Sequence, residues 1–148
     1  MSSQLALLFI DIDDYKDVNE RFGHSQGDEV LRELGREFNQ LIRGNDLVGR
    51  IGGDKFLVVL GDVSGAEDAR VVVKKLLEKI NNVEINNEKQ LVSANISALV
   101  FVADESNTIE GLLSSADDIL KQSRDAGRGQ YLLVNMTTSH VEMENSRA

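Results

Sequence analysis

The feature that most constrains the fold is a pair of glycines, Gly52-Gly53, between the apolar runs Leu47–Ile51 and Phe56–Leu60. Short apolar runs are typical of strands, and a Gly-Gly pair between two of them predicts a β-hairpin, because tight hairpin turns need residues with positive φ. A hairpin joins antiparallel strands. Its place in the middle of the chain therefore excludes a purely parallel, doubly wound sheet.

Further strands and helices surround this hairpin. Apolar runs predict strands over Leu5–Ile10, Gln90–Val102 and Gln130–Val134. Apolar residues at helical spacing predict helices over Tyr15–Phe22, Gln26–Arg43, Ala66–Ile80 and Ile109–Arg124, and Gly23 ends the first of them. This order predicts an α/β (α+β) fold with a central mixed, mainly antiparallel sheet flanked by helices.

Length and composition narrow the class of protein. A chain of 148 residues suits one compact domain, which we expect over residues 1–134. We expect the polar stretch 135–148 to be a linker, or the start of a helix that connects the domain to another part of a larger protein. The net charge of −9 argues against a nucleic-acid partner. No apolar run has the length of a membrane span, and the lack of cysteine suits a cytoplasmic location.

The first predicted strand ends in a cluster of carboxylates, Asp11, Asp13 and Asp14. Such a cluster can bind Mg²⁺, which prefers oxygen ligands, and Asp54 would join it if the hairpin lies beside this strand. Alternatively, the acids begin a helix whose dipole favours negative charge, and their spacing alone favours this second interpretation. Phosphoacceptor receiver domains also carry acids at this place, but the hairpin excludes their parallel sheet.

Two pairs of polar residues have the chemistry needed to bind guanine. Asp28 can accept the N1–H and N2–H₂ groups of guanine while Asn19 meets its O6/N7 edge. Ser25 and Asp28 also match a helix-capping box, and without other information the capping role is favoured. Arg43 and Asp46 can hold a phosphate and a guanine, or complement a helix end and a turn.

Cations bracket the end of the last predicted helix. Lys121, Arg124 and Arg128 lie there, and Gly127 is a candidate C-cap. The three cations can neutralise a triphosphate or interact with the carboxyl end of the helix dipole. The sequence leaves both interpretations open.

The order and spacing of these residues resemble the diguanylate cyclase (GGDEF) family over about residues 4 to 134. The resemblance is carried by the segments Asp11–Lys16, Asn19, Phe22–His24, Gly27-Asp28, Arg50–Phe56 and Gly127-Arg128. It implies a nucleotide-cyclase, ferredoxin-like GGDEF fold. It also implies the condensation of two GTP molecules into cyclic di-GMP by an antiparallel homodimer.

The resemblance implies roles for individual residues as well. Asp11, Asp54 and the Ile12 carbonyl correspond to the Mg²⁺ ligands of the family. The guanine-reading positions are Asn19 and Asp28, and the phosphate-contacting positions are Lys16, Gly52, Gly53, Arg124 and Arg128. An inhibitory site for cyclic di-GMP corresponds to Arg43 and Asp46, completed by Lys74 or Arg70 on the next helix.

One position departs from the family in a way that bears on catalysis. Lys55 stands where the family has a glutamate beside the metal and the reacting hydroxyl. At ~4 Å, each unit charge interaction is worth up to about 4 kcal/mol at an effective dielectric near 20, so a two-unit change predicts low or no cyclase activity. We therefore predict a degenerate module that binds GTP or cyclic di-GMP and regulates an attached sensory or EAL phosphodiesterase domain. The alternative is an active diguanylate cyclase.

Overall fold

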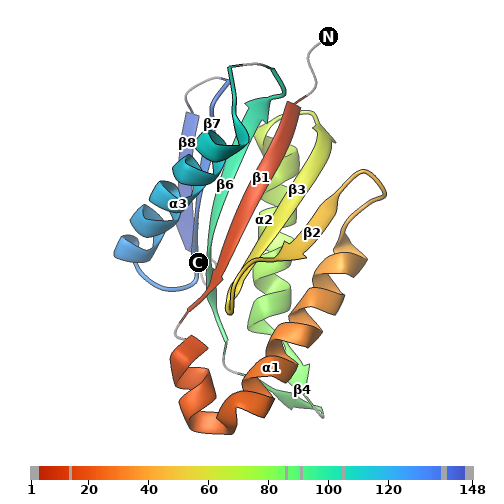
Figure 1. Cartoon of the computed structure of the whole chain (residues 1–148), viewed down its shortest axis with the longest axis vertical. Helices are drawn as coiled ribbons and strands as arrows, with labels where there is room; N and C mark the ends of the chain where they lie inside the picture. The colour runs from red at the N-terminus through yellow and green to blue at the C-terminus, as the bar shows by residue number, and fades with distance from the viewer. Residues whose placement is uncertain are drawn as a thin grey trace.

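A six-stranded sheet forms the centre of the molecule in the computed structural model (Figure 1). The structure describes residues 4–13, 15–85, 87–90, 92–104, 106–137 and 140–145, so that Asp14 of the acidic cluster lies outside the described residues. The strands of this sheet are β1 (Gln4–Ile12), β2 (Leu47–Arg50), β3 (Lys55–Val63), β6 (Ala94–Val102), β7 (Gln130–Asn135) and β8 (His140–Asn145).

The strand order across the sheet is β2-β3-β1-β6-β7-β8. β6 and β7 run parallel, and the other neighbouring strands run antiparallel. The predicted hairpin forms β2 and β3, and β3 lies beside β1. The prediction of a mixed, mainly antiparallel sheet flanked by helices is confirmed.

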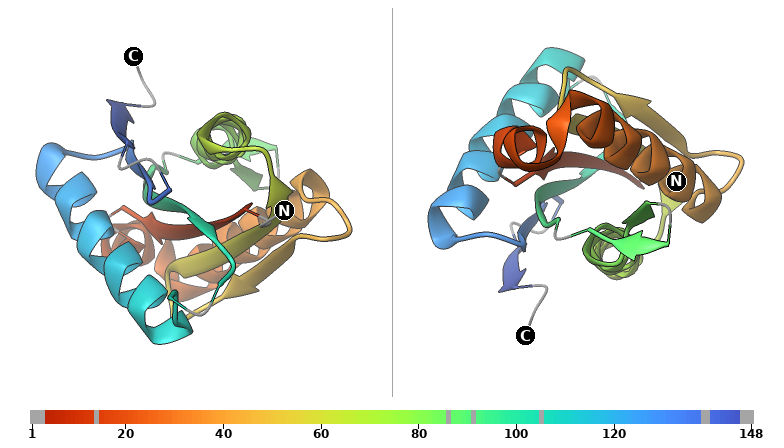
Figure 2. Two further views of the ribbon diagram at one scale, coloured as in Figure 1. Left: turned by 90° about the horizontal axis from the view of Figure 1, so that it is seen from above. Right: turned by 90° about the horizontal axis from the view of Figure 1, so that it is seen from below.

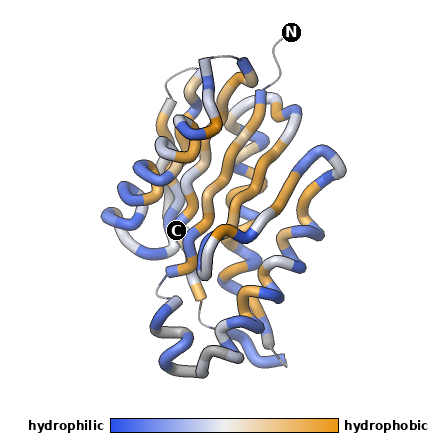
Figure 3. The backbone as a smooth tube through the Cα atoms, viewed as in Figure 1, coloured by the Kyte–Doolittle hydropathy of each residue, from blue (hydrophilic) through white to orange (hydrophobic). Residues whose placement is uncertain are grey.

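The helices cover both faces of the sheet. Helices α1 (Tyr15–Leu41) and α2 (Ala66–Asn81) pack on the face of β1 that carries Leu8 and Ile10. Helix α3 (Ile109–Ala126) packs on the face that carries Leu7 and Phe9, and Figure 2 shows α2 and α3 on opposite sides of the sheet. Since successive side chains of a strand point to opposite faces, β1 is buried on both sides. Figure 3 shows the resulting concentration of apolar residues in the central strands.

Helix α1 is broken at Gly23, as the sequence predicts. Gly23 has φ 83° and ψ 161°, which is outside the helical region and readily adopted only by glycine. The break redirects the chain, and Figure 1 shows the first part of α1 below the end of β1 while the second part runs up beside β2. Residues from the two parts of α1 are thereby brought together.

Two segments differ from the sequence-based prediction. The predicted strand Gln90–Val102 begins only at Ala94, because its first residue bonds elsewhere: Gln90 N–H donates to Val83 O at 2.9 Å. A small hairpin, β4 (Glu84–Ile85) and β5 (Glu88–Lys89), precedes it and is not predicted.

The second difference concerns the stretch 135–148. The sequence predicts a linker or the start of a helix, but Asn135 ends β7, and β8 pairs antiparallel with β7. The alternation Val141-Glu142-Met143-Glu144 has the two-residue period of a strand and explains this outcome. Across the described residues, no helix combines the length and apolar character needed to cross a bilayer.

Candidate functional site

The carboxyl end of β1 meets the Gly-Gly turn directly. Ile12 N–H donates to Asp54 O at 3.1 Å, and Ile51 N–H donates to Lys55 O at 2.8 Å to close the turn. Arg50 braces the turn by donating to Gly53 O from Nε at 3.2 Å and from an Nη at 2.8 Å. The juxtaposition that the predicted acidic cluster requires is therefore present.

A pocket of about 350 Å³ opens at this junction. Its lining residues come from β1, the turn, the start of α1, β6 and the end of α3: Asp11, Ile12, Asp13, Tyr15, Lys16, Asp54, Asn95, Arg124, Gly127 and Arg128. Six of the residues that the family resemblance assigns to metal and phosphate contacts are thus brought together: Asp11, Ile12, Lys16, Asp54, Arg124 and Arg128.

The glycines of the turn leave space beside the pocket. Gly52 has φ 76°, a conformation that L side chains rarely adopt. A Cβ atom at Gly52 or Gly53 would meet no atom within 4 Å. The turn is therefore open to a ligand that approaches the backbone.

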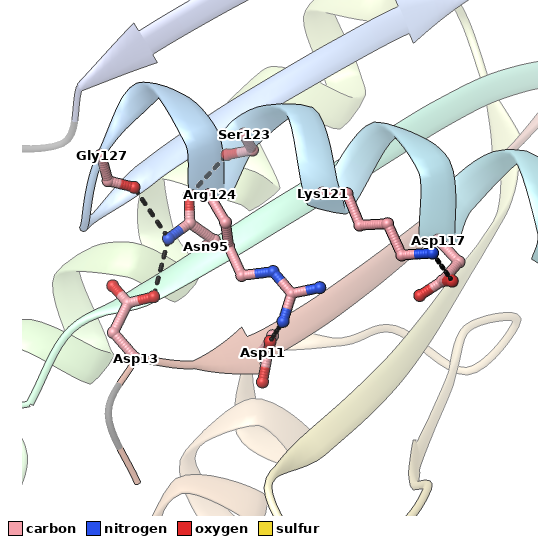
Figure 4. Close-up of polar contacts among 8 residues, drawn as sticks. All are labelled: Asp11, Asp13, Asn95, Asp117, Lys121, Ser123, Arg124 and Gly127. Carbon is pink, nitrogen blue, oxygen red and sulfur yellow. Dashed lines mark hydrogen bonds and ion pairs between the residues drawn. The ribbon is translucent and has the colours of Figure 1, made fainter. Parts of the chain in front are cut away.

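Asp11 is held in an ion pair with the end of α3. An Nη of Arg124 lies 2.8 Å from Asp11 Oδ2, and the exposed fractions of the two side chains are 40% and 7% (Figure 4). Burial and then the neighbouring Asp54 raise the pKa of Asp11 to about 6, while Arg124 and Lys55 act in the opposite direction. Asp11 is consequently a carboxylate whose charge is disfavoured by its surroundings and offset by two cations.

Lys55 faces the same side of the sheet as Asp11. The two residues are direct partners in the antiparallel register of β1 and β3. Side chains directly opposite one another in such a pair project from the same face and lie close together. Lys55, a half-buried lysine, therefore lies beside Asp11 at the position where the family has a glutamate.

Asp13 has a different role, which the sequence does not predict. Its carboxylate accepts hydrogen bonds from Ser93 Oγ at 2.8 Å, Asn95 Nδ2 at 2.7 Å and Gly129 N–H at 2.8 Å. Asn95 also accepts from Ser123 Oγ at 2.6 Å and donates to the Gly127 carbonyl at 3.1 Å (Figure 4). This buried network ties the end of α3 to β1 and β6. Its sequence signal is the presence of the polar residues Ser93 and Asn95 at the start of a strongly apolar stretch.

The guanine-reading candidates gather across the break in α1. A Cβ at Gly27 would overlap Asn19 Oδ1, so Asn19 packs directly on this glycine. The Tyr15 hydroxyl donates to Asp28 Oδ1 at a long 3.5 Å, and burial raises the pKa of Tyr15. The structure thus groups Asn19 and Asp28 around Tyr15. Their selection of guanine stays a prediction.

The candidate inhibitory site is built differently. Asp46 Oδ2 accepts from Arg43 N–H and Asp46 Oδ1 from Gly61 N–H, both at 3.0 Å, and the Asp46 side chain is only 4% exposed. The Arg43 side chain is 73% exposed, with Nε 3.8 Å from Asp46 Oδ2. Asp46 is therefore a turn-bracing residue, and Arg43 is the member of the pair that presents charge to solvent. Lys74 is exposed on α2, and Arg70 on the same helix pairs with Glu67.

Lys121, the third cation predicted near the end of α3, does not line the pocket. Lys121 Nζ lies 3.3 Å from Asp117 Oδ2 along the outside of α3 (Figure 4). Lys16 and Arg128, by contrast, are exposed residues that line the pocket. Of the cations near this helix end, Arg124 and Arg128 are those that the structure directs to the pocket.

Comparison with known proteins gives these features a family. The model of the family described as "Diguanylate cyclase, GGDEF domain" matches residues 1–130. The chain belongs to the GGDEF family. The resemblance carried by the sequence motifs is thereby confirmed, and with it a place in cyclic-di-GMP signalling.

Individual relatives agree in sequence and fold. The chain is 34% identical over 131 residues to the diguanylate cyclase DosC of Escherichia coli K12, a match that covers 87% of this chain and 28% of DosC. The GGDEF domain of TpbB (YfiN) from Pseudomonas aeruginosa is 30% identical, with a TM-score of 0.79 and coverage of 88% of this chain and 82% of that one. An EAL/GGDEF domain protein from M. capsulatus is also 30% identical, with a TM-score of 0.78 over 88% and 84%. The chain thus spans less than a third of the length of DosC.

Diguanylate cyclases generally use Mg²⁺, and the pocket can be tested for its fit to that ion. Asp11, the more buried of the two predicted carboxylate ligands, already pairs with Arg124, and Lys55 is its cross-strand partner. Within the described ranges, no three acidic, histidine or cysteine side chains are grouped to hold a metal. In the part of the chain that the structure describes, the side chains therefore do not form a preformed Mg²⁺ site.

Proposed function

We propose that this GGDEF domain is a degenerate regulatory module that binds GTP, cyclic di-GMP or both and has little or no diguanylate cyclase activity. The observation that carries the proposal is the position of Lys55, the cross-strand partner of Asp11 in the register of β1 and β3, which adds a positive charge next to an acidic residue of the pocket. The proposal is also supported by Lys16, Arg124 and Arg128, the predicted phosphate contacts that line the pocket.

The loss of activity follows from the chemistry of the reaction. The 3′-hydroxyl of one GTP must attack the α-phosphate of another, and the protein contributes mainly positioning and charge stabilisation. A carboxylate near the attacking hydroxyl can assist its deprotonation, whereas an ammonium group cannot accept that proton. Each 1.36 kcal/mol of lost transition-state stabilisation lowers the rate about tenfold, so one reversed charge is enough to suppress turnover.

Retention of binding is supported by the cations of the pocket. Lys16, Arg124 and Arg128 line it, and arginine is well suited to phosphate because its guanidinium group can donate two parallel hydrogen bonds. Asn19 and Asp28, grouped at the break in α1, supply the donors and acceptors that distinguish guanine. Fold and charge thus favour a guanine nucleotide as the ligand class.

The bound nucleotide serves as a signal for the rest of the parent protein. A relative of similar fold is an EAL/GGDEF domain protein, and another is described as a sensory box/GGDEF family protein. On this basis an attached EAL or sensory domain is the receiver or source of the signal. The domain acts in the cytoplasm, where GTP is available, and a homodimer can bring two such sites together.

An active diguanylate cyclase is the second candidate function. It is favoured by Asp11 and Asp54, the two acidic positions of the family that this pocket keeps. This second function requires that the positive charge of Lys55 does not prevent the carboxylates and the reacting 3′-hydroxyl from taking part in catalysis.

Product analysis separates the two candidates. The purified chain is incubated with GTP and Mg²⁺ and assayed for cyclic di-GMP, and nucleotide binding is measured by calorimetry. We expect binding without product, and product formation when Lys55→Glu restores the family residue. Lys75→Glu, the same charge change at an exposed position of α2 on the opposite face of the sheet, is the matched control and should yield none. Robust product from the unmodified chain would establish the second candidate instead.

A further inference from the structure

We propose that the pocket at the end of β1 binds the phosphates of a guanine nucleotide without a divalent cation, with Arg124 and Lys55 taking the place of the metal. This inference rests on the proposed function and adds to it how the ligand is held. It reverses the metal dependence that diguanylate cyclases generally have. Its basis is the arrangement of charges around Asp11.

The charges of the pocket are already balanced. Three carboxylates line it, Asp11, Asp13 and Asp54, together with the three cations Lys16, Arg124 and Arg128. Lys55, the cross-strand partner of Asp11, lies next to these lining residues and adds a further positive charge. An anionic nucleotide therefore enters a pocket lined by three cations and three carboxylates, with Lys55 as a further cation beside Asp11, rather than an acidic site that needs a metal to admit phosphate.

The carboxylates that remain are poorly available to a metal. Both oxygens of Asp13 accept hydrogen bonds from Ser93, Asn95 and Gly129, so this group has a structural role. Asp11 Oδ2 is taken by Arg124 at 2.8 Å. Mg²⁺ at Asp11 Oδ2 would have to displace the guanidinium group, and Mg²⁺ at the other oxygen of Asp11 would still lie near the positive charges of Arg124 and Lys55, which repel it.

A nucleotide meets no such obstacle. Arg124 lies in the last turn of α3 and its side chain is 40% exposed, so the guanidinium group can contact a phosphate at the mouth of the pocket. When Arg124 turns toward phosphate, Lys55 stays beside Asp11 and continues to offset its charge. Lys55 is therefore the residue that makes the metal dispensable, and its replacement by glutamate should restore the metal requirement.

The test compares GTP affinity in the presence of MgCl₂ with that in the presence of EDTA, by calorimetry on the chain as it stands. We expect the two affinities to agree within about tenfold. For Lys55→Glu we expect GTP affinity in EDTA to fall by more than about tenfold and to recover when MgCl₂ is added. Lys75→Glu should behave like the unmodified chain, because Lys75 lies on α2 across the sheet.

The outcomes separate this inference from the function on which it rests. GTP binding by the unmodified chain only when MgCl₂ is present would overturn metal-independent binding and leave the nucleotide-binding function intact. Binding under neither condition, for GTP and cyclic di-GMP alike, would overturn both. The comparison on the unmodified chain decides the matter even if Lys55→Glu does not fold.

Discussion

Asp11 and Asp13 stand two residues apart at the end of the same strand, and both are almost fully buried, yet the protein treats them in opposite ways. Asp13 accepts three hydrogen bonds from neutral donors, which satisfy its charge without any cation. Asp11 has one ion pair, with Arg124, and its pKa is raised to about 6 because burial and Asp54 oppose its ionisation. The comparison teaches that Asp13 holds the site together through neutral donors, while the charge of Asp11 is offset by cations that can also meet a ligand.

The largest change in stability is expected from a substitution of Asp13. Asp13→Ala leaves Ser93, Asn95 and the Gly129 N–H without their acceptor, and buried donors that lose a partner cost about 1–3 kcal/mol each. We expect the unfolding free energy, measured by urea denaturation, to fall by about 3–4 kcal/mol. Asp125→Ala, at an exposed position of α3, should change it by less than about 0.5 kcal/mol. Equal losses of unfolding free energy in Asp13→Ala and Asp125→Ala would contradict the structural role of Asp13.

At Asp11 we expect a substitution to raise the unfolding free energy rather than lower it, by an amount that depends on pH. Because the folded pKa of Asp11 is about 6 against 3.8 in the unfolded chain, the folded state keeps its proton in this window and stability falls as the pH rises through it. At 1.36 kcal/mol per pKa unit, this loss amounts to about 3 kcal/mol.

Asp11→Asn removes this titration while preserving the shape of the side chain. The difference in unfolding free energy between Asp11→Asn and the unmodified chain should therefore grow in favour of the variant by about 2–3 kcal/mol from about pH 4 to about pH 7. Urea denaturation across that range measures it. A difference that does not vary with pH would show that Asp11 ionises as easily as an exposed carboxyl.

Asp46 extends the comparison to the second candidate site, with a smaller expected effect. Like Asp13, it accepts hydrogen bonds, here from the backbone N–H groups of Arg43 and Gly61. Asp46→Ala should lower the unfolding free energy by about 1–2 kcal/mol. Thermal or urea denaturation tests this, and no change would mean that the loop is held by other contacts.

The smallest effect on stability is expected at Arg43. Its side chain is 73% exposed, and Arg43→Ala should change the unfolding free energy by less than about 0.5 kcal/mol. If the predicted inhibitory site binds cyclic di-GMP, the same substitution should abolish that binding in calorimetry. Binding of unchanged affinity would remove Arg43 from the ligand contacts and leave Asp46 with a structural role only.

Local sequence patterns predicted a large part of the fold. The Gly52-Gly53 turn, the apolar strands and the break at Gly23 depend on backbone freedom and apolar periodicity, which are properties of neighbouring residues. The alternating pattern in β8 is equally local. It covers only the four residues Val141-Glu142-Met143-Glu144, which is too short to distinguish a strand from a polar tail without the partner strand β7.

The candidate site was predicted less evenly. The family motifs identified Asp11, Lys16, Asp54, Arg124 and Arg128, and the structure does bring them to one pocket. Asp13 was grouped with Asp11 as one acidic cluster, since a sequence shows that both are carboxylates but not what donates to them. The role of Asp46 was similarly open between a ligand contact and a turn. The structure shows that its carboxylate accepts from the backbone N–H of Gly61 in β3, a contact that the sequence does not reveal.

The sequence by itself determined the family, the central hairpin and the replacement of a family glutamate by Lys55. Only the tertiary structure decided that Asp11 is paired with Arg124, 113 residues away, and that Asp13 is satisfied by Gly129, 116 residues away. The reason is physical. The state of a buried carboxylate depends on which distant groups packing brings within hydrogen-bonding distance, and burial is also what makes those contacts decisive.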